Sequence, residues 1–160
     1  MKKNYIVLPI FNDWKSLEKV LIILNKSFKN TKSSNHVVIV NDCSFNNLQK
    51  NKYKNFDNFK SLKLINLKKN VGSQKAIFFG LKYLQKKITK KTDQIIISIL
   101  DSDGEDNPKK LKELIHLANQ KKDYVIFASR KERTESIFFR LLNYFRLFIT
   151  FILTGKFINF

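Results

Sequence analysis

IIISILDSDGEDNP, residues 95–108, is the stretch of sequence that decides the fold. Its first six residues are almost all apolar and have the length of a strand, which predicts a central strand buried on both faces, as in a parallel sheet covered by helices. Four acidic residues follow within six positions. Asn107 and Pro108 then match a helix start, because Asn caps helices well and Pro has the backbone angle of a first helical residue.

The acidic residues are predicted to lie at the carboxyl end of this strand, where open α/β sheets bind ligands. Residues two apart in extended backbone point the same way, so Asp101 and Asp103 can converge on one point. Convergent carboxylates suit a hard cation such as Mg²⁺ or Mn²⁺ that also holds a diphosphate. The plainer interpretation is an acidic loop that caps the next helix, and the D-x-D motif by itself does not decide between the two.

The rest of the chain alternates between strand and helix patterns. Strands are expected at residues 5–8, 37–40, 62–67 and 124–127, and helices at residues 12–28, 72–84 and 108–120, with a short helix within 45–60. Pro9 should end the first strand, and Asn12 or Asp13 should cap the first helix. This alternation predicts βαβ units and an α/β fold with a mostly parallel sheet. Polar groups follow the first strand, the second strand and the strand at residues 95–100, so they should meet at one edge of the sheet.

The composition is that of a globular, strongly basic protein. The chain has 160 residues, of which 43% are hydrophobic and 13% aromatic, which excludes a disordered chain and fits one domain. Lys and Arg exceed Asp and Glu by 31 to 13, a net charge of +18 that attracts polyanions. The basic residues are scattered over every segment, so charge alone names no partner. Cys43, the only cysteine, cannot form an internal disulfide, which favours a reducing compartment.

The N-terminus does not match a signal peptide. Its apolar run, residues 5–11, is ended by Asn12 and Asp13, and no small-residue cleavage site follows. We therefore expect a cytoplasmic protein, with peripheral contact at the inner face of the cell membrane.

The C-terminal segment, residues 137–153, is almost entirely apolar and rich in Phe, with Arg140 and Arg146 on one polar stripe. A membrane-spanning helix needs roughly 20 apolar residues, and a mid-membrane Arg costs roughly 2.5–3.5 kcal/mol, so we predict no span. We expect an aromatic amphipathic helix that packs on the domain or lies in a membrane interface. The sequence ends at Phe160 without a polar tail, which we interpret as a chain cut short.

Four blocks of sequence resemble the motifs of one enzyme family, in the right order. They are LPIFN at 8–12 for P-x-Y/F-N, VNDCS at 40–44 for V-D-D-G-S, NVGSQKA at 70–76 followed by GL at 80–81 for N-x-G-x-x-x-A…G-L, and LDSDGEDNP at 100–108 for D-A-D-x-Q-D-x-P. Asn41, Cys43 and Glu105 replace the Asp, Gly and Gln of these motifs. The blocks, extended by the Arg-rich residues 130–146, resemble the family 2 glycosyltransferases with the GT-A fold, closest to the polyprenyl-phosphate, dolichol-phosphate mannosyltransferase-like branch.

This resemblance implies an inverting, metal-dependent transfer of a hexose from a nucleoside-diphosphate sugar to polyprenyl phosphate or a cell-envelope glycan. Residues 1–130 would form the Rossmann-like GT-A domain that binds the nucleotide sugar. Residues 131–160 would begin an Arg-rich, amphipathic part that faces the acceptor or the membrane. Family members supply the catalytic base from sequence that would follow Phe160, and we find no candidate for it in residues 1–160.

The resemblance also implies site residues, carried over by matching position. The donor nucleotide would be bound by Pro9, Phe11, Asn12, Asp42, Lys75 and Asp101. The cofactor, Mg²⁺ or Mn²⁺, would be held by Asp101, Asp103 and Glu105. The donor diphosphate or an acceptor phosphate would be held by Arg130, Arg133 and Arg140, because a guanidinium fork suits phosphate oxygens.

Other classes of protein fit the sequence less well. A sugar nucleotidyltransferase needs a Gly-rich loop after the first strand, and residues 8–12 contain no glycine. The motifs of Rossmann oxidoreductases and P-loop NTPases are both missing from the sequence. The non-enzyme alternative is a basic α/β module that binds nucleic acid or an anionic membrane, favoured by the charge of +18. Its binding would fall steeply with salt and would ignore Mn²⁺ and sugar nucleotides.

Overall fold

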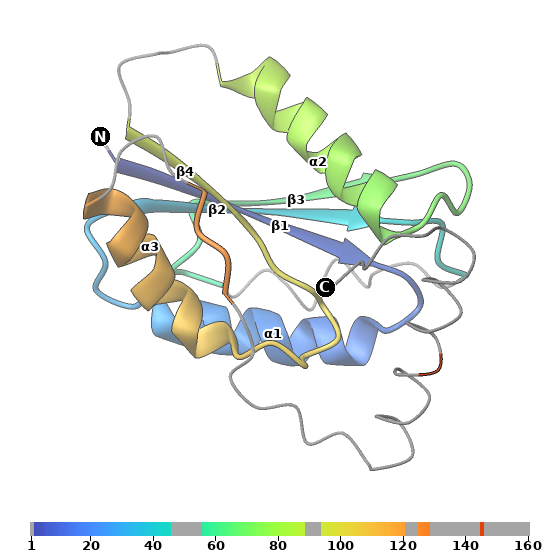
Figure 1. The fold of residues 1–160 in the computed structure, drawn as a ribbon. Helices are drawn as coiled ribbons and strands as arrows, with labels where there is room; N and C mark the ends of the chain where they lie inside the picture. The colour runs from blue at the N-terminus through green and yellow to red at the C-terminus, as the bar shows by residue number, and fades with distance from the viewer. Residues whose placement is uncertain (1, 46–55, 89–93, 121–124, 129–144, 146–160) are drawn as a thin grey trace. The chain divides into compact units, whose positions relative to one another are not determined.

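The computed structural model describes residues 2–45, 56–88, 94–120, 125–128 and 145 (Figure 1). The chain divides into two compact units, Met1–Ile126 and Phe127–Phe160. The described elements of the first unit follow one another as β1 (Lys2–Ile10), α1 (Trp14–Ser27), β2 (Ser34–Asn41), β3 (Ser61–Asn66), α2 (Ser73–Lys87), β4 (Gln94–Ile99), the short 3-10 turn η2 (Pro108–Lys110) and α3 (Leu111–Gln120).

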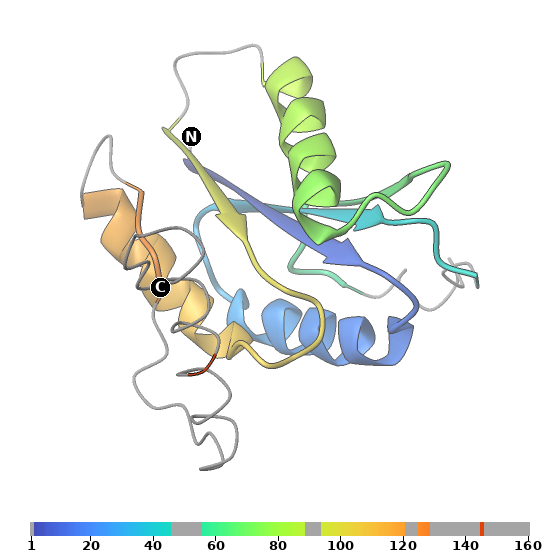
Figure 2. The same cartoon turned by 45° about the vertical axis from the view of Figure 1, so that its right-hand side comes forward.

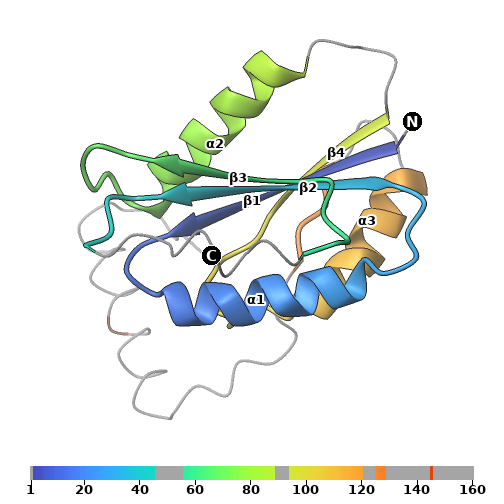
Figure 3. The same cartoon turned by 180° about the vertical axis from the view of Figure 1, so that it is seen from behind.

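The four strands form one parallel sheet in the order β3-β2-β1-β4. Figures 1 and 2 show α2 on one face of this sheet and α1 and α3 on the other. The same layers are seen from behind in Figure 3, with the carboxyl ends of β1, β2 and β3 at one side of the sheet. The α/β architecture with a parallel sheet, predicted from the alternation of strand and helix patterns, is confirmed.

The core lies on both faces of β1 and β2, because successive side chains of a strand point to opposite faces. In β1, Ile6, Leu8 and Ile10 pack in the cluster that contains α1, whereas Tyr5 and Val7 pack in the cluster that contains α2. All five side chains are buried. Asp13 caps α1 by accepting from the Ser16 N–H at 3.1 Å, as one of the two predicted caps. The predicted apolar positions of this helix are all buried: Leu17, Val20, Leu21, Leu24 and Phe28.

Among the strands that the structure describes, β4 does not have the central place that its apolar run predicted. Within the described residues it is an edge strand, and Ile97 and Ile99 are 43% and 50% exposed. Their register partners are Tyr5 and Val7, which lie on the α2 side of the sheet. α2 packs over β1 and β2, whereas α3 packs against β4 on the other face. An apolar run therefore identified the strand, but its place in the sheet depends on which helix covers it.

Pro9 does not end β1, which continues to Ile10. The Val7 carbonyl accepts from the Leu100 N–H at 3.1 Å, so the odd-numbered residues of β1 direct their backbone groups toward β4. β4 ends at Ile99, and its last residue pair with β1 is Val7 with Ile99. The N–H that Pro9 lacks would point toward β4 beyond this last pair, so its absence removes no hydrogen bond between paired residues of the two strands. On the other side, the Asp42 N–H still donates to the Ile10 carbonyl at 2.8 Å.

The fifth predicted strand, residues 124–127, does not form over the part of it that the structure describes. Residues 125–128 have irregular backbone. Val125 is 78% exposed, and a strand needs a hydrogen-bonded neighbour to form. Most of the short helix expected within 45–60 lies outside the described residues, and so does the aromatic helix expected at 137–153 apart from Phe145. Among the helices that the structure describes, none is both long and apolar enough to cross a bilayer.

Gly80 allows α2 to approach the sheet closely. A Cβ atom at this position would lie 2.7 Å from Cγ1 of Val7 and 3.0 Å from Cγ2 of Val40. We expect Gly80→Ala to lower the free energy of unfolding by about 1–2 kcal/mol, because overpacking a rigid core outweighs the gain in helix propensity. Chemical denaturation of Gly80→Ala in the wild-type and Val7→Ala backgrounds measures this. An equal cost in both backgrounds would show that the contact with Val7 is not the cause.

Candidate functional site

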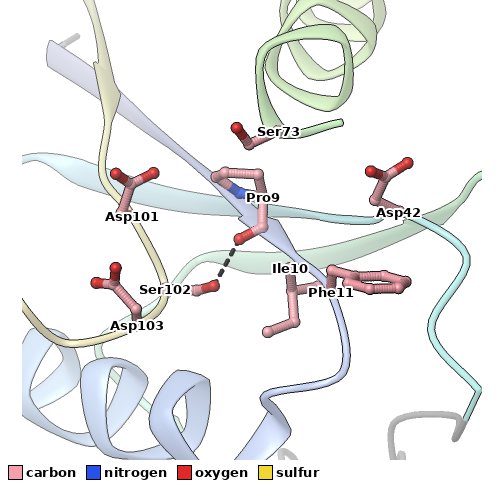
Figure 4. Close-up of a pocket in the computed structure, with 8 residues that line it drawn as sticks. All are labelled: Pro9, Ile10, Phe11, Asp42, Ser73, Asp101, Ser102 and Asp103. Carbon is pink, nitrogen blue, oxygen red and sulfur yellow. Dashed lines mark hydrogen bonds between the residues drawn. The ribbon is translucent and has the colours of Figure 1, made fainter. Parts of the chain in front are cut away.

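A pocket of about 240 Å³ lies at the carboxyl edge of the sheet (Figure 4). The ends of β1, β2 and β4 and the first residue of α2 contribute its lining: Pro9, Ile10, Phe11, Asp42, Ser73, Asp101, Ser102 and Asp103. The polar groups predicted to meet at one edge of the sheet therefore do so. This edge is also where a parallel α/β sheet binds its ligands.

Ser102 fixes the loop that carries the two aspartates. Its hydroxyl donates to the Pro9 carbonyl at 2.6 Å, and only 7% of the residue is exposed. Figure 4 shows Asp101 and Asp103 on the other side of this loop from the Ser102 hydroxyl. The two carboxylates therefore lie on one side of the loop, although residues 102–104 form bends rather than the extended backbone that the prediction assumed. Both residues are exposed and line the pocket.

The third predicted metal ligand, Glu105, does not line the pocket. Its N–H donates to Oδ1 of Asp103 at 2.9 Å, after a turn in which Gly104 has a φ of +83°. Among the described residues, no three His, Cys, Asp or Glu side chains are grouped closely enough to hold a metal ion. The described protein atoms therefore offer Asp101 and Asp103 as two carboxylates at one pocket, rather than a complete set of ligands. Mg²⁺ is commonly bound in this way, by one or two carboxylates together with substrate phosphates.

Asp42 has a different environment from the other two aspartates, because it is 3% exposed. Its Oδ1 accepts from the Val71 N–H and its Oδ2 from the Gly72 N–H, both at 2.8 Å. These two residues directly precede α2, whose first residue, Ser73, lines the pocket. Asp42 therefore ties the end of β2 to the start of α2, a contact that the sequence motif did not indicate.

Asn41, which replaces an Asp of the family motif, bridges the ends of two strands. It is 3% exposed, and its Nδ2 donates to Oδ1 of Asn66, its register partner on β3, at 3.0 Å. Its Oδ1 accepts from the Ser44 N–H at 2.9 Å. An aspartate could accept from Ser44 but could not donate to Asn66. The substitution therefore gives this strand end a donor that the family residue lacks.

Asn12 joins the loops that follow β1 and β2. Its N–H donates to the Ser44 hydroxyl at 2.8 Å, and its Oδ1 accepts from the Phe45 N–H at 2.9 Å. Its φ of +63° lies in the left-handed region, which Asn adopts more readily than most residues. The link holds the rings of Phe11 and Phe45 with their centroids 6.4 Å apart. Phe11 is 45% exposed and lines the pocket, whereas Asn12 is exposed and does not line it.

Cys43, which replaces the Gly of the motif, has a φ of +61°. This left-handed backbone costs a residue with a side chain about 1–2 kcal/mol but costs glycine little. We expect Cys43→Gly to raise the free energy of unfolding by about 1 kcal/mol, measured by urea denaturation. Cys43→Ala is the matched control, since it removes the thiol near the Lys68 carbonyl but keeps the strain. Equal stabilisation by both variants would contradict this explanation.

The remaining predicted site residues lie elsewhere. Lys75 is exposed in the first turn of α2 and does not line the pocket. The three arginines predicted to bind phosphate, Arg130, Arg133 and Arg140, lie outside the described residues.

Asp13, which caps α1, accepts hydrogen bonds from Ser16 that hold the pKa of its carboxyl below the usual value.

Sequence reasoning missed Ile10, Ser73 and Ser102 as pocket residues. Ser102 could have been found from the expectation of extended backbone, in which the residue between two aspartates that face one way faces the other way. Ser73 follows from the helix start at Gly72, because that helix begins at the same edge of the sheet as the acidic loop.

Comparisons with known proteins agree with this architecture. The sequence model for "Glycosyl transferase family 2" matches residues 5–159. An uncharacterized glycosyltransferase of Synechocystis sp. is 27% identical over 128 residues, which are 80% of this chain and 37% of that protein. The crystal structure of S. aureus TarS shares the fold with a TM-score of 0.55 and 21% identity, over 84% of this chain and 24% of TarS.

This chain thus spans about a third of the length of the curated relative and about a quarter of that of TarS. The likeness to TarS supports the predicted GT-A type of α/β fold, with a parallel sheet flanked by helices. Since the family match extends over nearly all of its residues, the chain belongs to glycosyl transferase family 2.

Proposed function

We propose that this chain binds the donor of an inverting, metal-dependent glycosyltransferase, which moves a hexose from a nucleoside-diphosphate sugar to polyprenyl phosphate or a cell-envelope glycan. The observation that carries the proposal is the pocket at the carboxyl edge of the sheet, where Asp101 and Asp103 face the same space as Phe11 and Ser73. An apolar ring and acidic groups in one pocket match the two ends of a nucleoside diphosphate, its base and its metal-bound phosphates.

The base and ribose would bind at the Phe11 end of the pocket. The exposed face of this ring can stack on a nucleobase, and Pro9 lies beside it in the same wall. Asn12 would act through the loop contacts described above. Asp42, whose two oxygens already accept backbone hydrogen bonds, would position the wall of the pocket first and contact the nucleoside only through its remaining lone pairs.

The diphosphate would bind at the Asp101 and Asp103 end of the pocket. Two exposed carboxylates on one side of the loop fit a hard divalent cation, Mg²⁺ or Mn²⁺, whose other ligands would be phosphate oxygens and water. Such a cation would stabilise the charge that builds up on the departing nucleoside diphosphate. Glu105 would add a negative charge beside this site. Lys75, in the first turn of α2, and the arginines at 130, 133 and 140 would contribute positive charge toward the phosphates.

The protein's own contribution to the chemistry would be to hold the donor for in-line attack at its anomeric carbon. Ser102 supports this role, because its buried hydrogen bond to Pro9 fixes both aspartates relative to the nucleoside wall. A lipid-phosphate acceptor is already anionic, whereas a hydroxyl acceptor needs a general base. Residues 1–130 would carry the donor site, and residues 131–160 would face the acceptor or the inner face of the membrane.

Equilibrium binding of a panel of uridine and guanosine diphosphate sugars, with Mn²⁺ present, tests the proposal. We expect saturable binding of at least one sugar nucleotide, and measuring transfer to polyprenyl phosphate in the same samples separates donor binding from turnover. Failure of every sugar nucleotide to bind, at concentrations where single-stranded nucleic acid binds in a salt-dependent way, would instead favour the basic-module alternative.

A further inference from the structure

The outer face of α2 carries an unusual combination of exposed aromatic and basic side chains. Phe78 and Phe79 are 59% and 40% exposed, although they lie on a helix whose inner face is well packed on the sheet. Their rings contact each other edge to face, with centroids 6.1 Å apart. Scattered apolar residues are normal on protein surfaces, but two adjacent exposed phenylalanines form a patch that needs an explanation.

This patch lies directly opposite the packed face of the helix. Ala76, Gly80 and Leu84 are buried against the sheet and recur every four residues. At about 100° per residue, the outer arc of about 100° contains both phenylalanines together with three exposed lysines, Lys75, Lys82 and Lys86. In Figures 1 and 2, α2 lies by itself on its side of the sheet among the described elements, so this arc faces away from them.

The charge of α2 indicates what kind of surface would cover the patch. The helix contains four lysines and no acidic residue, and two more exposed lysines, Lys68 and Lys69, lie in the loop before it. The flexible stems of lysine let its ammonium group reach phosphate while apolar neighbours insert more deeply. Aromatic residues at the interface, with basic residues at head-group level, are what an anionic bilayer recognises in an amphipathic helix.

We propose that the outer face of α2, formed by Lys75, Phe78, Phe79, Lys82 and Lys86, docks on an anionic membrane surface. The docking itself does not depend on sugar transfer. Its benefit rests on the proposed function, because α2 begins at Ser73 in the lining of the pocket. With a rise of about 1.5 Å per residue, the two phenylalanines lie within about 10 Å of that end along the helix axis. A docked helix would thus bring the donor site to the depth of a phosphate on a membrane-bound acceptor.

Co-sedimentation of the full chain with vesicles tests the proposal. We expect binding to phosphatidylcholine vesicles that contain about one third phosphatidylglycerol, weak binding to pure phosphatidylcholine, and loss of affinity with added salt. A protein with a net charge of +18 can bind anionic vesicles by any of its faces, so the location must be tested separately. Equal binding to both kinds of vesicle, or to neither, would overturn the proposal.

A pair of charge variants tests the location. Lys82→Gln with Lys86→Gln should weaken vesicle binding about tenfold or more, since each lysine near an anionic surface contributes about fivefold. The matched control is Lys15→Gln with Lys19→Gln, an exposed pair with the same spacing and the same change in charge on α1, across the sheet. The control should change binding by less than about threefold. Its lysines lie on the other side of the sheet from α2, so a membrane docked on α2 would be farther from them than the screening length of about 10 Å. Equal losses in the two variants would show that α2 is not the docking face.

A second pair of variants tests the phenylalanines. Phe78→Gln with Phe79→Gln should weaken binding about tenfold, and the binding that remains should be more sensitive to salt. Ile22→Gln with Leu117→Gln, which changes similarly exposed apolar residues on α1 and α3, should have little effect. Circular dichroism confirms folding, and binding of nucleoside diphosphate in solution should be unchanged in all four variants. Vesicle binding through α2 without any nucleotide binding would refute the proposed function but not the docking face. Nucleotide binding without vesicle binding would refute the docking face but not the proposed function.

Discussion

Asp103→Ala is expected to abolish the metal-dependent part of donor binding while leaving the fold intact. Asp103 is exposed, lines the pocket and lies on the same side of the loop as Asp101, so it is placed to hold a cation against the donor's phosphates. Since even residues that only orient metal ligands change metal affinity by about 10–100-fold, we expect a loss of at least about 100-fold in nucleoside-diphosphate affinity with Mn²⁺. Calorimetric titration measures this affinity.

The matched control for Asp103→Ala is Asp106→Ala. Asp106 belongs to the same acidic loop, and its substitution removes the same charge, but it does not line the pocket. We expect the control to change the affinity by no more than about threefold, as screened charges near a site do. If both variants lost affinity equally, the effect would come from the charge of the whole loop. If neither did, the basic-module alternative would gain support, because such a module does not need this carboxylate.

Asp42→Ala is expected to differ from Asp103→Ala by lowering the stability of the fold. It would leave the backbone N–H of Val71 without its acceptor, at about 1–3 kcal/mol if that group stays buried, whereas the Gly72 N–H would keep its bond to Oδ1 of Asn70 at 3.1 Å. We therefore expect the free energy of unfolding to fall by about 1–3 kcal/mol, as measured by chemical denaturation. Donor affinity should fall as well, because Ser73 follows these two residues and its position in the pocket depends on them.

Asp42→Asn separates positioning from direct contact with the donor. The amide keeps one acceptor oxygen but turns a donor toward the second N–H, so its stability should lie between those of the wild type and Asp42→Ala. Asp103→Ala serves as the comparison, because it should change affinity without changing stability. An Asp42 variant that lost donor affinity at unchanged stability would show that Asp42 acts by contacting the nucleoside, as the family motif implied.

The parts of the fold that periodicity specifies could be predicted from the sequence. Leu17, Val20, Leu21 and Leu24 recur at helical spacing and are buried, because a helix that packs on a sheet must turn one apolar stripe inward. The β4 strand was predicted from its nearly continuous apolar run of strand length. Its position at the edge of the described sheet was not predicted, since apolar content does not reveal which neighbour lies beside a strand or which helix covers it.

The candidate site was predicted in its location more than in its contacts. Parallel strands bring their carboxyl ends to one edge, so residues that follow β1, β2 and β4 had to meet there, and they do. The role of Asp42 could not be predicted, because its partners are backbone N–H groups 29 and 30 residues away. Backbone groups leave no trace in a sequence motif. The same limit applies to Asn41, which replaces the family's Asp. Its amide donates to Asn66 on β3, a partner 25 residues away that the motif does not contain.

The central claim is that two carboxylates at the edge of the sheet hold the phosphates of the donor through a divalent cation. The most direct test compares the affinities of a nucleoside diphosphate and of the corresponding nucleoside, each with Mn²⁺ and with a chelator. We predict that Mn²⁺ tightens the binding of the diphosphate by at least about tenfold and leaves that of the nucleoside unchanged. Diphosphate affinity that is the same with Mn²⁺ and with the chelator would contradict the claim.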